Sequence, residues 1–194
     1  MTKTTFFDRS SFPECFFDCT PEEMGERYFP LMKGYSRALL VLHGYAVAFG
    51  RYPPRDFEVV LVDGYWQKLL ATEAAMGLDP DWVRNASSIL PSADVVILLD
   101  IDPELVLSRG RKGKPYECGG DFSCSNESFL KHQRRARGFL LQMAEKHDWP
   151  VLDASGSVDQ IFSQIKATID EPISELARKK SNLLEAGAGL RNDI

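Results

Sequence analysis

Three short apolar runs, each ending in a carboxylate, limit most strongly how this chain can fold. They cover Phe57–Asp63, Ala93–Asp100 and Trp149–Asp153, and helical patterns separate them. Continuous apolar runs, unlike alternating ones, are typical of strands buried on both faces of a parallel sheet. Strands that alternate with helices predict an α/β domain, with a mainly parallel sheet between two layers of helices.

The intervening segments show helical periodicity. We expect helices from Glu22 to about Phe49 (restarted or kinked at Pro30), over Tyr65–Met76 and Asp81–Ile89, from Pro103 to about Arg109, over Asn126–Lys146 and Val158–Ile169, and in a charged tail from Glu171. Residues Gly110–Ser125 contain five glycines and prolines, which predicts a mobile loop.

Bulk composition excludes some functions. The formal net charge of −5 argues against a broad nucleic-acid-binding face. No apolar run approaches the length of a membrane span, and residues 1–11 do not resemble a secretory signal, so we expect a cytoplasmic protein. The four cysteines lie in C-x3-C and C-x5-C spacings, for which we expect reduced, unligated thiols; a zinc ion shared by the two pairs is the alternative.

Acidic residues stand at the carboxyl end of every predicted strand. They are Asp63, Asp100 with Asp102, and Asp153. Ligands of open parallel sheets bind beyond these ends, so the acids mark a candidate site. Each aspartate can instead cap the helix that follows it, and for any one of them alone capping is the preferred interpretation.

Several segments, in this order, resemble the thymidylate kinases, a family of P-loop nucleoside monophosphate kinases. They are Thr20-Pro-Glu22, Val62-Asp-Gly-Tyr65, the run from Ala93 to Pro103, Leu107-Ser-Arg109-Gly, Tyr116-Glu117, and Val151-Leu-Asp-Ala-Ser155. The resemblance covers roughly residues 15–169. It implies a P-loop NTPase-like nucleotide-binding domain over residues 1–170, followed by a helical tail over residues 171–194.

The resemblance also implies an activity and its partners. The expected reaction is ATP-dependent phosphoryl transfer to a nucleoside monophosphate, with dTMP to dTDP first, in nucleotide biosynthesis. ATP and Mg²⁺ are the implied cofactors, with no protein-bound metal centre. A nucleotide is the implied substrate, and a homodimer is compatible with the family; nucleic acid and membranes are not expected partners.

Residue roles follow from the same resemblance. Asp63 is expected near the phosphates and a magnesium-bound water. The lid cations Arg111, Lys112 and Lys114 are expected over the transferring phosphate, where phosphoryl transfer needs charge neutralisation. The alternative for these cations is a solvated basic turn.

The remaining roles concern the two nucleotides. The residues expected around the adenine are Arg109, Asp153, Ala154 and Ser155. Those expected at the acceptor are Glu22, His43, Tyr65, Tyr116 and Glu117. An ordinary helix histidine is the alternative for His43, and a core position is the alternative for Tyr65.

The chain departs from the family pattern in two ways. The phosphate-binding motif G-x-x-x-x-G-K-[ST] is not found, and Met1–Thr5 matches only its last residues. To explain the absent motif, we favour the interpretation that this sequence starts inside a longer gene. The alternatives are a pseudo-kinase and a replacement strand at Lys3–Phe7. Other residues also stand where the family has arginines, at Gly64, near His43 and near Pro115. A guanidinium from Arg37, Arg134, Arg135 or Arg137 could supply the missing positive charge.

These departures leave two other functions open. One is a nucleotide-binding module without catalysis. The other is a related kinase for a nucleoside or another small phosphate acceptor.

Overall fold

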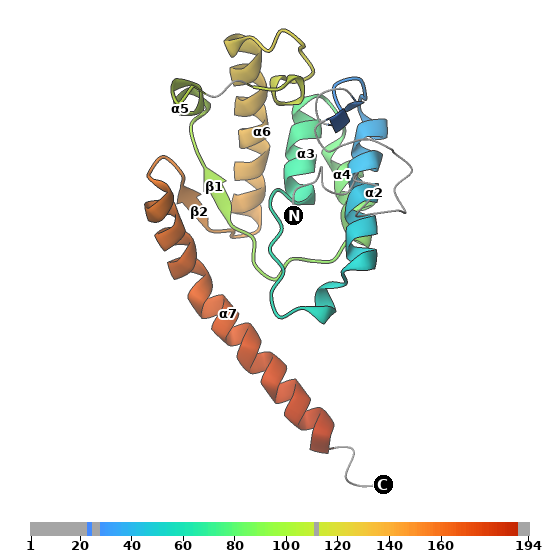
Figure 1. Ribbon diagram of the computed structural model, residues 1–194, viewed down its shortest axis with the longest axis vertical. Coiled ribbons are helices and arrows are strands. Elements are labelled where there is room, and N and C mark those ends of the chain that lie inside the picture. The colour runs from blue at the N-terminus through green and yellow to red at the C-terminus, as the bar shows by residue number, and fades with distance from the viewer. Residues whose placement is uncertain (1–22, 25–27, 111–112, 190–194) are drawn as a thin grey trace.

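The computed structural model describes residues 23–24, 28–110 and 113–189, with side chains up to residue 178. Its helices are α2 (Tyr35–Arg51), α3 (Trp66–Ala75), α4 (Pro80–Ala86), α5 (Pro103–Ser108), α6 (Asn126–Lys146) and α7 (Val158–Gly189), with 3-10 turns η3 (Pro54–Asp56), η4 (Ser87–Ile89) and η5 (Pro115–Cys118). Its strands are β1 (Leu98–Asp100) and β2 (Val151–Asp153). The helices dominate the arrangement in Figure 1.

Local side-chain hydrogen bonds explain where the helices near the candidate site begin. The Asp102 carboxylate accepts from the backbone N–H of Glu104, and Pro103 occupies a first-turn position that needs no donor. The Ser125 hydroxyl accepts from the backbone N–H of Ser128 and starts α6. The capping interpretation is therefore confirmed for Asp102, and the predicted bounds of α6 are confirmed in full.

The two strands pair in parallel, with Leu98 opposite Val151 and Asp100 opposite Asp153. This pairing confirms a parallel sheet, which in the described part of the chain has only these two strands. Both are three residues long, shorter than the apolar runs that predicted them, and Val151 remains 45% exposed. Within the described residues, burial on both faces is therefore not observed for β2.

The predicted strand over Phe57–Asp63 is wrong for this structure. These residues form no strand, and their apolar side chains are exposed, with Leu61 at 81%. A strand needs a neighbouring backbone to satisfy its N–H and C=O groups, and none of the described strands lies beside it. The segment instead lines an apolar groove of about 370 Å³ with Tyr45, Phe49 and Tyr52 of the α2 region.

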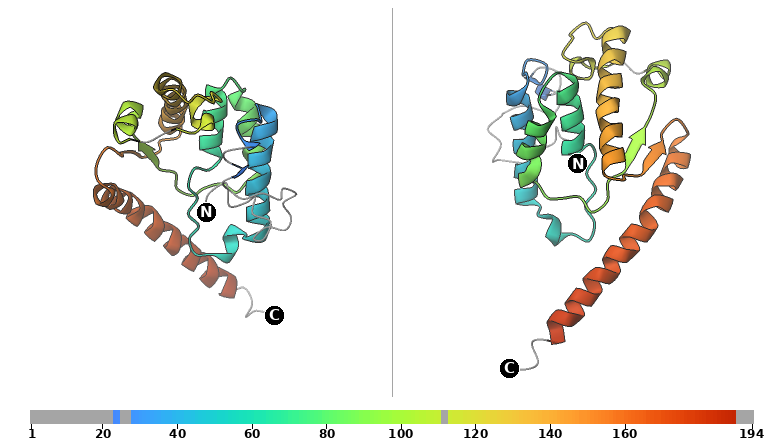
Figure 2. Two further views of the ribbon diagram at one scale, coloured as in Figure 1. Left: turned by 45° about the horizontal axis from the view of Figure 1, so that its top comes forward. Right: turned by 180° about the vertical axis from the view of Figure 1, so that it is seen from behind.

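Helix α7 also differs from expectation. One continuous helix replaces the two predicted on either side of residue 170, and Pro172 lies inside it. Figures 1 and 2 show α7 starting beside β2 and extending away from the rest of the molecule. The division into a domain and a tail at residue 170 stays a prediction.

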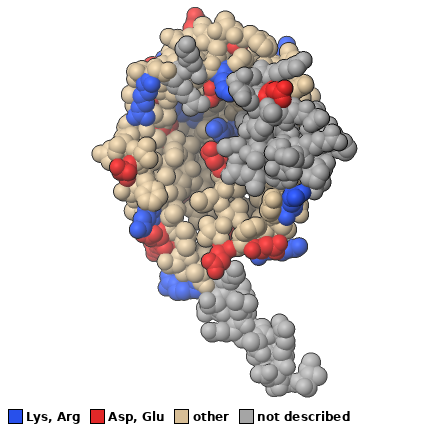
Figure 3. All heavy atoms as spheres, in the orientation of Figure 1, with Lys and Arg blue, Asp and Glu red and all other residues tan. Residues whose placement is uncertain are grey.

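The core lies where α3 packs between α2, α4 and α6. Its most deeply buried apolar side chains include Tyr45, Leu70 and Val83, each exposed by 2% or less. Figure 3 shows a hollow near the middle of one face, bordered by both basic and acidic side chains. Among the described helices, none is long and apolar enough to cross a membrane.

Candidate functional site

The carboxyl ends of β1 and β2 bring two of the predicted acids together. Asp100 and Asp153 are register partners, and the backbone N–H of Ala154 donates to the Asp100 carbonyl at 2.8 Å. Arg137 of α6 donates to both carboxylate oxygens of Asp100, from Nε at 2.6 Å and Nη2 at 2.7 Å. The Asp100 charge is therefore neutralised from α6, and the Asp153 carboxylate lies on the other strand.

Asp153 shapes the turn that follows β2. One of its carboxylate oxygens accepts from the Ser155 backbone N–H and the other from the Ser155 hydroxyl, each at 2.8 Å. These hydrogen bonds lower the pKa of Asp153 below its ordinary value. The carboxylate thus organises the turn after β2; it does not cap α7, which begins at Val158 with the Ser157 hydroxyl accepting from the Gln160 backbone N–H.

Arg109 reaches the same turn from the end of α5. Its guanidinium Nη2 donates to the backbone carbonyl of Ser155, across 46 positions of sequence. The predicted adenine-site residues Arg109, Asp153, Ala154 and Ser155 are therefore neighbours in the structure. Their binding role stays a prediction.

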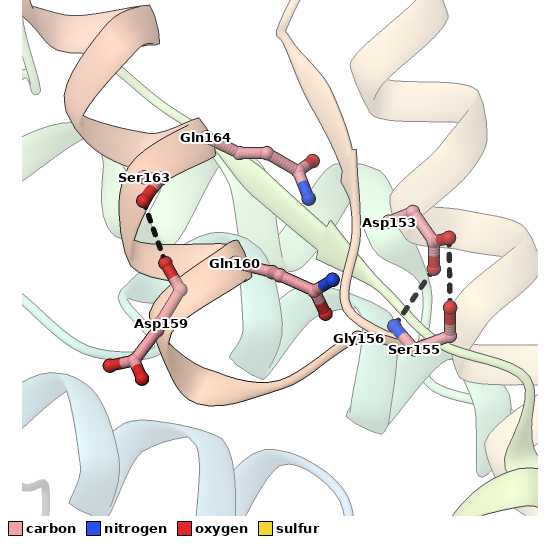
Figure 4. A pocket seen from close by; sticks show the side chains of 7 residues that line it. All are labelled: Asp153, Ser155, Gly156, Asp159, Gln160, Ser163 and Gln164. Atoms are coloured by element: carbon pink, nitrogen blue, oxygen red, sulfur yellow. Dashed lines mark hydrogen bonds between the residues drawn. The ribbon is translucent and has the colours of Figure 1, made fainter.

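An open pocket of about 630 Å³ lies next to this turn. Figure 4 shows Asp153 and Ser155 at one side and α7 at the other, with Gln160 and Gln164 extending from α7 toward the space between them. The volume lies within the range typical of small-molecule sites. The sequence did not single out Gln160 and Gln164, because glutamines near a helix start are usually solvated.

The predicted lid is compact where it is described. The Glu117 carboxylate accepts from the Lys114 backbone N–H at 3.0 Å, and the Gln133 side chain of α6 donates to the Glu117 carbonyl at 2.8 Å. Cys118 and Cys124 are joined by a disulfide. The expectation of reduced thiols is therefore wrong for this pair, because the loop folds back and brings the two sulfurs together.

Some predicted residues cannot be placed. Arg111 and Lys112 of the lid and Glu22 of the acceptor site lie outside the described residues, as do Cys15 and Cys19. No group of three or more metal-binding side chains occurs in the part of the chain that the structure describes.

Tyr116 connects the lid to a second charged cluster. Its ring lies 5.1 Å from the Arg37 guanidinium carbon, and Arg37 makes a two-point ion pair with Glu73 at 2.7 Å for each contact. Arg37 also donates to the Met32 carbonyl at 2.6 Å. Burial, and next the negative charge of Glu73, raise the pKa of Tyr116.

Glu73 was missed by the sequence reasoning. Its side chain is 0% exposed, although it carries a charge. The signal was available, since an acid in the run Leu69-Leu-Ala-Thr-Glu-Ala-Ala75 falls on the apolar face of the predicted helix. Buried acids need a partner, so this position called for a cation nearby.

The other predicted residues lie apart from the pocket. Asp63 is exposed in the turn before α3. The pKa of Tyr45 is raised first by its own burial, next by Tyr65 and then by the charge of Asp63. Within the described residues, no hydrogen bond or ion pair joins Asp63 to Arg109 or Asp153. Tyr65 is buried in the core and donates to the Pro91 carbonyl at 2.8 Å, the position that its alternative interpretation describes.

His43 is half-buried on α2. Its Nε2 atom is buried and has no hydrogen-bond partner among the described residues. Its predicted role at the acceptor stays a prediction.

Comparison with known proteins adds sequence relatives to this geometry. No family model matches the chain. It is 27% identical over 110 residues to the probable thymidylate kinase 1 of Saccharolobus solfataricus, covering 57% of this chain and 53% of the relative. The thymidylate kinase of Schizosaccharomyces pombe is 32% identical over 106 residues, or 54% and 48% of the two chains. The chain is a relative of the thymidylate kinases.

A third thymidylate kinase is similar over a longer part of the chain. The probable thymidylate kinase of Archaeoglobus fulgidus is 30% identical over 127 residues, covering 63% of this chain and 58% of its own. The chain spans about half the length of the curated thymidylate kinases that it matches. The resemblance to thymidylate kinases is thus confirmed over somewhat more than half of the chain.

Proposed function

We propose that this chain carries the nucleotide-binding part of an ATP-dependent phosphotransferase. In this proposal the γ-phosphoryl group of ATP passes to a nucleoside monophosphate, with dTMP as the first candidate acceptor. The relationship with thymidylate kinases supports the class of reaction. The observation that carries the proposal is the hydrogen bond from Arg109 to the Ser155 carbonyl, which joins two sequence-distant adenine-site segments beside the pocket that Ser155 lines.

The chemistry of this pocket suits a purine base. A guanidinium is planar and weakly hydrated, so it stacks well on an aromatic ring. The guanidinium of Arg109 is held in place by its hydrogen bond to the Ser155 carbonyl. The side-chain amides of Gln160 and Gln164 line the pocket and supply donors and acceptors at its edge. The pocket volume of about 630 Å³ is large enough for a nucleoside.

The phosphates would extend from this pocket toward the lid. Lys114 is an exposed cation of the described lid, and Asp63 is the exposed acid that the family resemblance places near magnesium. Mg²⁺ usually takes one or two protein carboxylates together with phosphate oxygens, so a single aspartate is compatible with it. Bound Mg²⁺ would supply charge neutralisation at the phosphates.

We place the acceptor beside Tyr116. Its ring packs on the guanidinium of Arg37, which is one of the arginines suggested as replacements. Glu73 occupies both donor positions of that guanidinium on one side. Because the Met32 carbonyl and the Tyr116 ring cover the rest of this guanidinium and Arg37 is 3% exposed, Arg37 positions Tyr116 and does not itself bind the acceptor phosphate.

The proposed fold is a three-layer P-loop kinase fold. The parallel pair β1 and β2 supports it. The remaining strands of that fold are part of the proposal.

Calorimetry with ATP tests the nucleotide site directly. We expect Arg109→Met to weaken ATP binding by at least tenfold, about 1.4 kcal/mol. The control is Arg84→Met on α4, where an exposed arginine pairs with Asp81. Equal ATP affinity in wild type and Arg109→Met would refute the adenine site.

A coupled assay for ADP release, with Mg²⁺ and a panel of nucleoside monophosphates, tests the reaction. Turnover greatest with dTMP supports the proposal, whereas turnover with a different acceptor supports a related kinase. Absence of turnover with every acceptor would refute catalysis by this chain.

A nucleotide-binding module without catalysis is the second candidate. It is favoured by Gly64, which stands where the family has an acceptor-binding arginine and adopts a left-handed φ of 66°. Tight ATP binding combined with no turnover would select this function.

A further inference from the structure

Two sulfurs lie at the centre of the described lid. Cys118 ends η5 and Cys124 precedes α6, and their Cα atoms are 5.4 Å apart, within the usual range for a disulfide. Cys118 is 3% exposed, whereas Cys124 is half-buried. Cys124 is thus the more exposed of the two bridged residues.

The lid packs against this bridge. A Cβ atom placed on Gly113 would lie 2.9 Å from Cys118 Sγ, 3.0 Å from Cys124 Sγ and 2.8 Å from the Phe129 ring. Such distances leave no room for a side chain, so the Gly113 backbone lies directly on the sulfurs. The position of the segment that leads to Lys114 therefore depends on whether the bridge is closed.

The rest of the segment is also held in an unusual conformation. Cys124 has φ of 44°, which non-glycine residues adopt infrequently. Gly119, with φ of 70°, lies against the His132 ring. Backbone strain of this kind persists only where surrounding contacts enforce it, and the disulfide is a covalent contact within the segment.

We propose that Cys118 and Cys124 form a reversible exchange site for low-molecular-weight thiols, and that its redox state sets the order of residues 113–124. A thiolate attacks Cys124 Sγ, the S–S bond breaks, and Cys118 leaves as a thiolate that takes up a proton. A second thiolate then attacks the external sulfur of the mixed disulfide, its bond to Cys124 Sγ breaks, and Cys124 leaves as a thiolate that takes up a proton. The products are the protein dithiol and the oxidised small-molecule disulfide, and the reverse sequence closes the bridge.

The consequence for function rests on the acceptor site proposed above. Tyr116 lies two residues before Cys118, with its ring 5.1 Å from the Arg37 guanidinium carbon. Opening the bridge releases Tyr116 from this position together with the lid. The closed bridge thereby presents an ordered acceptor site, and the open bridge a disordered one.

Hydrogen exchange of the full chain, equilibrated in glutathione buffers from fully reduced to fully oxidised, tests the proposal without nucleotide. Differential alkylation with peptide mapping reports the state of each cysteine. We expect the amides of residues 113–124 to exchange about tenfold faster in the reduced protein, with α3 unchanged. Because neither measurement needs nucleotide, failure of the kinase proposal leaves this result intact.

The matched variant is Cys118→Ser with Cys124→Ser, which is expected to show fast exchange of residues 113–124 in every buffer. Free thiols at both positions across the whole glutathione range would overturn the proposal. Equal exchange of residues 113–124 in the two redox states would overturn it too, and this comparison uses the unsubstituted chain.

Discussion

Arg37 and Glu73 form a buried two-point ion pair between α2 and α3. Arg37 Nε lies 2.7 Å from Glu73 Oε1 and Nη2 lies 2.7 Å from Oε2, and the two side chains are 4% and 0% exposed. The Met32 carbonyl and the Tyr116 ring occupy other faces of the same guanidinium. One cation thus links α2, α3 and the lid.

Removing one member of this pair should be costly. Glu73→Gln leaves the Arg37 charge buried without its counter-ion, and we expect it to lower the free energy of unfolding by about 3 kcal/mol. Chemical denaturation measures this loss. The control is Arg37→Met with Glu73→Leu, which removes both charges and is expected to cost less than the single change; a larger, additive loss would contradict the ion-pair explanation.

Gly64 should not tolerate a side chain. Its φ of 66° is left-handed, and a Cβ atom there would lie 2.8 Å from Lys68 Cδ. We expect Gly64→Ala to lower the free energy of unfolding by about 1–2 kcal/mol. Gly50 in α2 has open space around it, so Gly50→Ala is the matched control and should stabilise by about 0.5 kcal/mol. Equal effects at the two positions would contradict the backbone argument.

Stability should fall as the pH drops from 6.5 to 4 because of His132. Burial, followed by the charges of Arg37 and Arg135, lowers the pKa of His132 to about 4. In this window the unfolded chain binds a proton that the folded chain does not, so protonation favours unfolding. Between pH 7 and pH 5 we expect a loss of about 2 kcal/mol from this residue.

Urea denaturation of wild type and His132→Gln at both pH values isolates that contribution. Other titrating groups are common to the two proteins, so the difference between their pH slopes belongs to His132. Identical slopes would show that His132 titrates normally in the folded chain.

The Tyr45 hydroxyl should stabilise the turn before α3. It donates to the Gly64 carbonyl at 2.6 Å. We expect Tyr45→Phe to lower the free energy of unfolding by about 1–2 kcal/mol, because it leaves that acceptor without its donor. Tyr65→Phe, which removes the hydrogen bond to the Pro91 carbonyl, is the comparison, and calorimetric unfolding measures both. If Tyr45→Phe is as stable as the wild type, the Tyr45 hydroxyl does not stabilise this turn.

Patterns local in sequence predicted most of the helices, but the helix expected to restart at Pro30 begins only at Tyr35, after a turn that ends at Gly34 with a left-handed φ. The bounds of α6 follow from its apolar periodicity and the Ser125 cap, and α5 begins where Asp102 and Pro103 predict it. Helical hydrogen bonds join residues four positions apart, so the information that forms a helix lies within the helix itself. The apolar runs before Asp100 and Asp153 likewise predicted a parallel pair, although not its short length.

Long-range partners could not be predicted in the same way. The run at residues 57–63 has a strand's composition but forms none, because pairing depends on a neighbour that its own residues do not encode. The Cys118–Cys124 bridge and the Arg109–Ser155 contact likewise require the chain to fold back.

The sequence by itself determined most of the helices, the acids that end β1 and β2, and the kinship with thymidylate kinases. The tertiary structure alone decided that Glu73 is neutralised by Arg37, that Asp100 is bound by Arg137, and which predicted residues meet at one pocket. The physical reason is that helix propensity and capping act over a few residues. Ion pairs and pockets depend on distances between segments, which only the folded chain sets.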